Sequence, residues 1–212
     1  MESQDLRISD FETRYQERVP RIQGLRNAYA VLIPLIEFNG EINLLFEIRA
    51  SSLKRQPGEI CFPGGRIENK ETIIECALRE TREELGVPSK EIQILGQTDY
   101  LYSASGAAIF PVLGSLSKEG FAALAPNPSE VESTFLAPFS HFQEEAPLVY
   151  HYDLVPRIPG DFPYDLLGID ESYHWRSGGQ VEVPIFNVED HVIWGITGRI
   201  LLGLLKEMGK DL

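Results

Sequence analysis

The chain has 212 residues, of which 19 are Lys or Arg and 32 are Asp or Glu, so its formal net charge is −13. This charge argues against nonspecific nucleic-acid binding, which depends on Lys and Arg side chains that neutralise phosphates. The length is that of one domain, no apolar run is long enough to span a membrane, and residues 1–7 have no secretory character. We therefore expect a single cytoplasmic domain over residues 1–212.

The first half of the chain predicts a helix, a hairpin and a second helix. Residues 1–22 place Phe11, Tyr15 and Val19 at helical spacing, with Asp10 as the N-cap and Pro20 as the end, and we treat this helix as an extension of the domain. Apolar and β-branched segments predict strands at 29–38 and 42–48, joined by the turn dipeptide Asn39-Gly40, and an extended piece at 59–62.

The second half of the chain predicts further strands and a closing helix. Strands are expected at 92–102, 109–113, 131–137, 148–155 and 181–188. Residues 115–130 indicate a loop with some helix, 138–142 a turn or short helix, and the Pro- and Gly-containing stretch 156–180 a loop. An amphipathic helix is predicted at 189–208, with an apolar face formed by Val192, Ile193, Ile196, Ile200, Leu201 and Leu204. Strands on both sides of a central helix indicate an α+β fold with a mixed sheet between helices.

A carboxylate-rich helix after a glycine turn is the most informative segment. Ile74, Leu78, Thr81 and Leu85 recur at helical spacing and predict a buried stripe, whereas Glu80, Glu83 and Glu84 are expected on another face. Carboxylates three and four residues apart repel each other by about 0.2–0.5 kcal/mol per pair. A hard cation such as Mg²⁺ would turn that repulsion into attraction, because it prefers oxygen ligands. The alternative is a solvated acidic face that binds nothing.

The spacing of this segment resembles the Nudix box, which is Gly, five residues, Glu, seven residues, Arg-Glu, an aliphatic residue, any residue, Glu-Glu, any residue, Gly and an aliphatic residue. Thr81 departs from this pattern by replacing the usual aliphatic residue, and its methyl group can still face the core. The matching residues are Gly65, Glu71, Arg79, Glu80, Glu83, Glu84, Gly86 and Val87. The resemblance implies a Nudix-type α/β/α sandwich and a hydrolase that uses Mg²⁺ or Mn²⁺ on a nucleoside diphosphate derivative.

A second resemblance concerns the substrate. The segment 44–65, which ends in Gly-Glu-Ile-Cys-Phe-Pro-Gly-Gly, is similar to the signature of coenzyme A pyrophosphatases, and residues 193–197 resemble another segment of that subfamily. Many members have His where this chain has Gln56. The expected products are 3′,5′-ADP and 4′-phosphopantetheine, or its acylated form. Arg49, Lys54 and Arg55 form a basic cluster suited to the phosphates, next to the backbone of Gly64 and Gly65.

The resemblance also implies roles for individual residues. Glu80, Glu83 and Glu84 are the expected metal ligands, and Glu83 is also a candidate base. Glu130 lies on a loop where some Nudix enzymes place an extra ligand or base. Arg79 is expected to be structural, pairing with Glu71 or Glu75, and Gly86 is expected to cap the helix in the left-handed conformation.

Several alternatives stay open at this point. The same chemistry could act on ADP-ribose, NADH or a nucleoside triphosphate, and a Nudix-fold binding module without hydrolysis is a further reading. Many superfamily members are dimers, but no segment here marks a homodimer interface. Cys61 and Cys76 are expected to be packed thiols. The four histidines show no metal spacing and are expected to be ordinary surface or hydrogen-bonded residues, namely His141, His151, His174 and His191.

Overall fold

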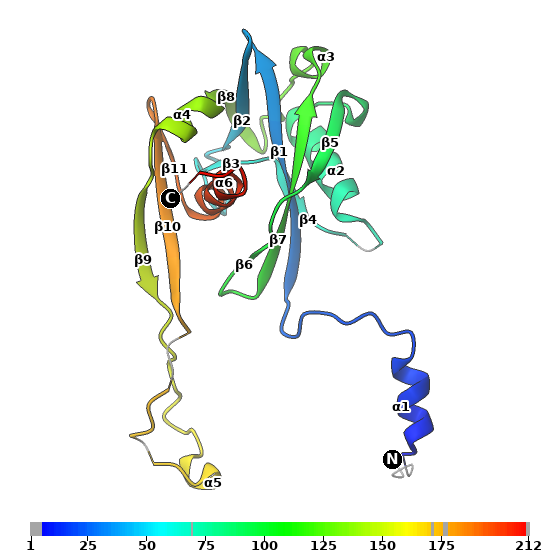
Figure 1. Cartoon of the computed structure of the whole chain (residues 1–212), viewed down its shortest axis with the longest axis vertical. Coiled ribbons are helices and arrows are strands. Elements are labelled where there is room, and N and C mark those ends of the chain that lie inside the picture. Colours follow the sequence, from blue (N-terminus) through cyan, green and yellow to red (C-terminus); the bar gives the residue numbers. More distant parts are fainter. Residues whose placement is uncertain (1–5, 69, 171, 176–177, 211–212) are drawn as a thin grey trace.

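A computed structural model describes residues 6–68, 70–170, 172–175 and 178–210 (Figure 1). The helices are α1 (Ile8–Tyr15), α2 (Ile73–Leu85), α3 (Lys118–Ala122), α4 (Phe139–Glu144), α5 (Tyr164–Leu167) and α6 (Gly195–Glu207), with a 3₁₀ turn η1 (Ser89–Glu91). The strands are β1 (Asn27–Phe38), β2 (Glu41–Arg49), β3 (Ile60–Cys61), β4 (Gly64–Arg66), β5 (Ile92–Gln97), β6 (Leu101–Tyr102), β7 (Ala107–Leu116), β8 (Val131–Pro138), β9 (Leu148–Asp153), β10 (Gln180–Val188) and β11 (His191–Ile193). Every helix in this part of the chain is too short or too polar to serve as a membrane-spanning segment.

Strand β1 is the centre of a mixed eight-stranded sheet with the order β3-β2-β1-β7-β5. It runs parallel to β7 on one side. On the other side it pairs antiparallel with β4 through its first half and with β2 through its second half. Strands β6 and β8 pair with β7 and β2, respectively. The position of β4 in this sheet matters for the site, because it brings the glycine turn beside the centre of β1.

The sheet lies between α2 on one face and α6 on the other (Figure 1). Successive residues of a strand point to opposite faces, and β1 follows this rule: Leu32 belongs to the core beneath α2, and Ile33 belongs to the core beneath α6. Cys76, Ala77 and Leu85 of α2 are fully buried in the first core. This arrangement confirms the predicted α/β/α sandwich with a mixed central sheet.

A second, three-stranded sheet has the order β11-β10-β9. Its two long strands continue beyond the main body as an arm that ends near α5 (Figure 1). Helix α1 lies apart from both sheets and buries none of its residues. Helices α1 and α5 and strand β9 bury no residue, whereas β10 and β11 contribute Phe186, Val188 and Ile193 to the core.

Most predicted elements are confirmed, some with different ends. Asn39 and Gly40 have φ values of 53° and 80° and form the expected two-residue turn between β1 and β2. Thr81 is fully buried as expected, and its hydroxyl donates to the Ala77 carbonyl at 2.7 Å, so the polar atom is satisfied within the helix. The predicted strand at 109–113 extends to Ala107–Leu116, and the loop at 115–130 contains the short helix α3.

The predicted boundaries of the closing helix are wrong. Glu189 has a φ of 51°, which a helix interior excludes, and Glu189-Asp190 reverses the chain so that Val188 pairs with His191. Val192 and Ile193 therefore lie in β11, and the helix begins at Gly195. The predicted strand at 92–102 is likewise divided into β5 and β6, and the pairing of β4 with β1 was not predicted.

The predicted ends of the N-terminal helix also need correction. The helix begins at Ile8, and Asp10 caps it from the third helical position by accepting the Arg7 backbone N–H at 2.8 Å. It ends at Tyr15, well before Pro20. The prediction for residues 1–5 lies outside the described residues.

The end of α2 provides a stability test. Gly86 has a φ of 73°, and a Cβ there would lie 2.9 Å from the Ala125 carbonyl oxygen. We expect Gly86→Ala to lower the free energy of unfolding by about 1–2 kcal/mol, because a left-handed residue with a Cβ is strained. Gly203→Ala is the matched control: it lies inside α6 with nothing within 4 Å, and should stabilise by about 0.5–1 kcal/mol. Urea denaturation measures both, and equal stability of Gly86→Ala and wild type would contradict the capping role.

Candidate active site

The glycine turn approaches β1 and α2 more closely than any residue with a side chain allows. A Cβ at Gly64 would lie 2.6 Å from the Val31 Cα, and a Cβ at Gly65 would overlap the Glu80 carboxylate. A Cβ at Gly64 would collide with the backbone of β1, so glycine is required there, whereas a Cβ at Gly65 would displace the flexible Glu80 carboxylate. The two glycines therefore let the backbone of β4 lie directly against the carboxylates of α2.

Both ends of α2 are fixed by local hydrogen bonds. At its start, the Thr72 hydroxyl accepts the Glu75 N–H at 3.2 Å, and the Glu75 carboxylate accepts the Thr72 N–H at 2.8 Å, which is a capping box. At its end, Gly86 takes the left-handed conformation and donates its N–H to Arg82. These caps hold the carboxylates of the helix in a defined register against the turn.

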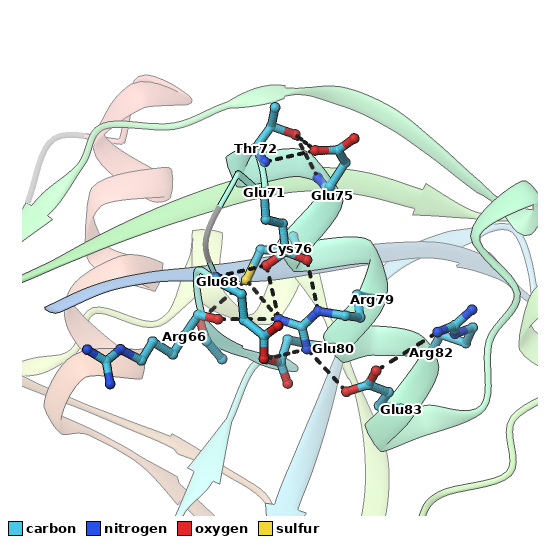
Figure 2. Close-up of polar contacts among 12 residues, drawn as sticks. Arg66, Glu68, Glu71, Thr72, Glu75, Cys76, Arg79, Glu80, Arg82 and Glu83 are labelled. Atoms are coloured by element: carbon cyan, nitrogen blue, oxygen red, sulfur yellow. Dashed lines mark hydrogen bonds and ion pairs between the residues drawn. The ribbon is translucent and has the colours of Figure 1, made fainter.

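Arg79 joins the turn to the helix (Figure 2). Its Nε and Nη2 donate to both oxygens of Glu71 at 2.8 and 3.1 Å, and its Nη1 donates to Glu80 at 2.8 Å and to Glu83 at 3.1 Å. The hydrogen bond from Arg79 lowers the pKa of Glu71 to about 2. Glu71 and Glu75 were the two expected partners of Arg79. The structure pairs Arg79 with Glu71, because the Glu75 carboxylate already accepts a hydrogen bond from the Thr72 hydroxyl.

Glu84 is turned toward the glycine turn and away from solvent. It is only 4% exposed, and one carboxylate oxygen accepts the Gly64 N–H at 2.8 Å. Burial, followed by the negative charge of Glu47, raises the pKa of Glu84 well above its ordinary value. Burial also raises the pKa of the neighbouring Glu80. The two adjacent carboxylates lie in different environments, because Glu83 is half exposed and Glu84 is buried.

Glu47 is the residue that the sequence reasoning missed. It lies on β2, is fully buried, and accepts the Cys61 thiol at 3.1 Å through one oxygen, while its second oxygen is buried without a hydrogen-bond partner. Burial raises its pKa, and the charges of Glu130 and Glu80 add to this effect. The available signal was a single carboxylate inside the apolar run Leu44–Ile48, on the same strand face as buried Leu45.

Four carboxylates thus lie close enough to repel one another: Glu47, Glu80, Glu84 and Glu130. Oxygen donors in this number, together with an orphaned buried carboxylate oxygen, fit a hard divalent cation chemically. In this structure one oxygen of Glu80 accepts from Arg79 and one oxygen of Glu84 accepts from Gly64. No three His, Cys, Asp or Glu side chains of the described residues form a metal cage.

A cleft of about 610 Å³ opens beside these carboxylates. Arg49 and Arg55 line it, and the Arg49 Nε is buried without a hydrogen-bond partner; Lys54 is exposed and is not among the lining residues. The remaining wall mixes polar and apolar side chains and joins the turn to the start of α6, with members that include Tyr29, Phe62, Gly64, Gly65, Glu84, Ser103, Ser105, Trp194, Ile196 and Thr197. The two segments that resemble coenzyme A pyrophosphatases therefore meet in one cleft, where the Thr197 hydroxyl donates to the Ile60 carbonyl at 3.0 Å.

Comparison with protein families gives a match to the NUDIX domain over residues 26–148. The chain is 32% identical over 206 residues to an uncharacterized Nudix hydrolase NudL of Photorhabdus laumondii, covering 95% of this chain and 97% of that protein. It is 34% identical to the peroxisomal coenzyme A diphosphatase NUDT7 of Mus musculus, covering 74% and 63% of the two chains. It is 29% identical to the human mitochondrial coenzyme A diphosphatase NUDT8, covering 85% and 69%.

Among solved structures, a MutT/nudix family protein of Enterococcus faecalis aligns with a TM-score of 0.51 at 15% identity, covering 96% of this chain and 70% of that chain. This likeness concerns the fold alone.

The buried carboxylates predict a pH dependence of stability. Their pKa values in the native state are raised above the ordinary value of 4.5, so the native state holds protons that the unfolded chain has released. The free energy of unfolding without metal should therefore fall as pH rises above about 4.5. Mg²⁺ should raise the melting temperature more at pH 8.5 than at pH 6, because carboxylate ligands bind metal when deprotonated.

Thermal melts in EDTA and in Mg²⁺ measure this dependence. Glu47→Gln should reduce the slope with pH, whereas Glu132→Gln, which removes one charge from an exposed residue of β8, should leave it unchanged. Equal slopes in the two variants would show that general charge repulsion, and not the buried cluster, sets the pH dependence.

Proposed function

The chain belongs to the Nudix family of hydrolases, and from this we propose that its substrate is coenzyme A or an acyl-coenzyme A. Hydrolysis of the pyrophosphate bond would release 3′,5′-ADP and 4′-phosphopantetheine or its acylated form. The observation that carries the proposal is the cleft itself, in which Glu84 of α2, the glycine turn, two arginines and the apolar side chains of Trp194 and Ile196 meet. The names of the mouse and human relatives support the same substrate class.

The cleft offers complementary groups for each part of such a molecule. Arg49 and Arg55 supply guanidinium donors, which pair with phosphate oxygens through two parallel hydrogen bonds. The buried, unpartnered Nε of Arg49 is an available donor in a protein that is otherwise strongly acidic. The apolar side chains of Trp194 and Ile196 suit the uncharged pantetheine chain or an acyl group.

The carboxylates are the groups proposed to hold Mg²⁺ or Mn²⁺, with Glu80, Glu83 and Glu84 from α2 and Glu130 from the loop before β8. When bound, such a cation neutralises phosphate charge and makes water a stronger nucleophile. Glu84 is positioned by Gly64, and Glu80 is positioned by Arg79. Glu83 or Glu130 would take the proton from the attacking water, since both have solvent access in the described structure.

The first test is a product assay on the wild type and on Glu84→Gln. We expect wild type with Mg²⁺ or Mn²⁺ to release 4′-phosphopantetheine from coenzyme A, and Glu84→Gln to lower kcat by about 10²–10⁴-fold, because one buried carboxylate is lost. Glu132→Gln is the matched control and should retain wild-type turnover. Near-normal turnover of Glu84→Gln would remove this residue from the site, and a much higher efficiency on ADP-ribose, NADH or a nucleoside triphosphate would overturn the substrate assignment.

The second test separates two adjacent basic residues. Arg55 lines the cleft and Lys54 does not. Arg55→Ala should therefore raise KM for coenzyme A about tenfold, the loss of one charged hydrogen-bond pair, whereas Lys54→Ala should change KM less than about twofold. Steady-state kinetics on both variants decide the point, and equal effects would show that the basic cluster acts only through its general charge.

A further inference from the structure

The two long strands of the second sheet form a ribbon whose faces differ sharply in chemistry. The register pairs Leu148 with Ile185, Tyr150 with Val183 and Tyr152 with Val181. Directly opposed residues of an antiparallel pair point to the same side. These six side chains therefore share one face of the ribbon, here called the outer face, and every one of them is apolar or aromatic.

The opposite face of the ribbon is the one that packs against α6. A Cβ at Gly198 of α6 would lie 2.7 Å from the Pro184 carbonyl oxygen, and the Lys206 Nζ lies 3.7 Å from the Glu182 carboxylate. Phe186 continues this face into the main core. The outer face consequently points away from α6, so its apolar side chains lie where an antiparallel sheet usually presents polar residues to solvent.

The β9 side chains of the outer face are exposed in the single chain, and its β10 side chains are partly buried. Leu148, Tyr150 and Tyr152 are 56%, 61% and 51% exposed, and Val192 of β11 continues the face at 50%. A two-stranded ribbon is marginally stable by itself and needs a layer on its apolar face. Contiguous exposed apolar patches of this kind mark interaction sites. Helix α1, whose own apolar residues are exposed, lies on the far side of the molecule from the ribbon and does not supply this layer (Figure 1).

We propose that the outer face is the interface of a two-fold symmetric homodimer, in which it packs face to face against the outer face of a second copy. The face carries no charge, so two molecules with a net charge of −13 can meet there without burying a carboxylate. The same net charge opposes binding to nucleic acid or to an anionic membrane.

The shape of the outer face also suits self-association. Strand β9 contributes a row of large side chains, Leu148, Tyr150 and Tyr152, and β10 contributes a row of β-branched ones, Val181, Val183 and Ile185. A two-fold axis parallel to the strands sets the large row of one copy over the small row of the other. The tyrosine hydroxyls can reach the edge of such an interface and remain hydrated.

Sedimentation velocity of the full chain tests this interface. We expect a wild-type dimer and a dissociation constant raised by at least about tenfold in Tyr150→Glu, because the substitution buries an unpaired charge in the interface. Val149→Glu is the matched control. It makes the same type of change on the next residue of the same strand, which is also exposed but points to the opposite face, and its dissociation constant should stay within about twofold of wild type. Near-ultraviolet circular dichroism and thermal melts establish that both variants are folded.

Three outcomes would overturn the proposal. They are a monomeric wild type, a folded Tyr150→Glu that dimerises as tightly as wild type, and equal weakening by Tyr150→Glu and Val149→Glu. If the wild type is monomeric, binding to phosphatidylcholine vesicles would assign the outer face to a membrane instead.

Discussion

The repulsion among carboxylates where β2, β4 and α2 approach one another is the constraint on which the site depends. Glu47 and Glu84 are nearly or fully buried, and the charge of Glu47 raises the energy of ionising Glu84. The fold holds them with few compensating bonds: one backbone N–H for Glu84 and one thiol for Glu47. A fold that retains such a cluster loses stability as the carboxylates ionise. A bound cation would restore that stability by neutralising their charge.

The rest of the active-site architecture serves this cluster. The glycines of β4 bring the backbone donor to Glu84, and the caps of α2 fix the register of its carboxylates. Arg79 donates hydrogen bonds to both Glu71 and Glu80. Arg79 therefore neutralises part of the carboxylate charge beside the cluster. The proposed dimer interface lies on the second sheet and is independent of these interactions.

Local sequence signals predicted much of this structure, and tertiary contacts decided the remainder. The turn at Asn39-Gly40, the left-handed Gly86 and the buried Thr81 follow from spacing and backbone preference, which neighbours in sequence determine. Burial of Glu47 depends on β2, β3 and α2 meeting, which spacing within one strand does not reveal. The choice of Glu71 over Glu75 for Arg79 likewise depends on Thr72 occupying Glu75. The predicted helix at 189–208 starts too early because the turn at Glu189-Asp190 contains neither Gly nor Asn, the residues that usually signal such a turn.

The central claim is that the buried carboxylates form a divalent-cation site. Anomalous diffraction from crystals soaked in Mn²⁺ tests it most directly. The account predicts a strong peak beside the carboxylates of Glu80 and Glu84. A map without a peak there, in which Glu80 still accepts from Arg79 and Glu84 still accepts from Gly64, would contradict it.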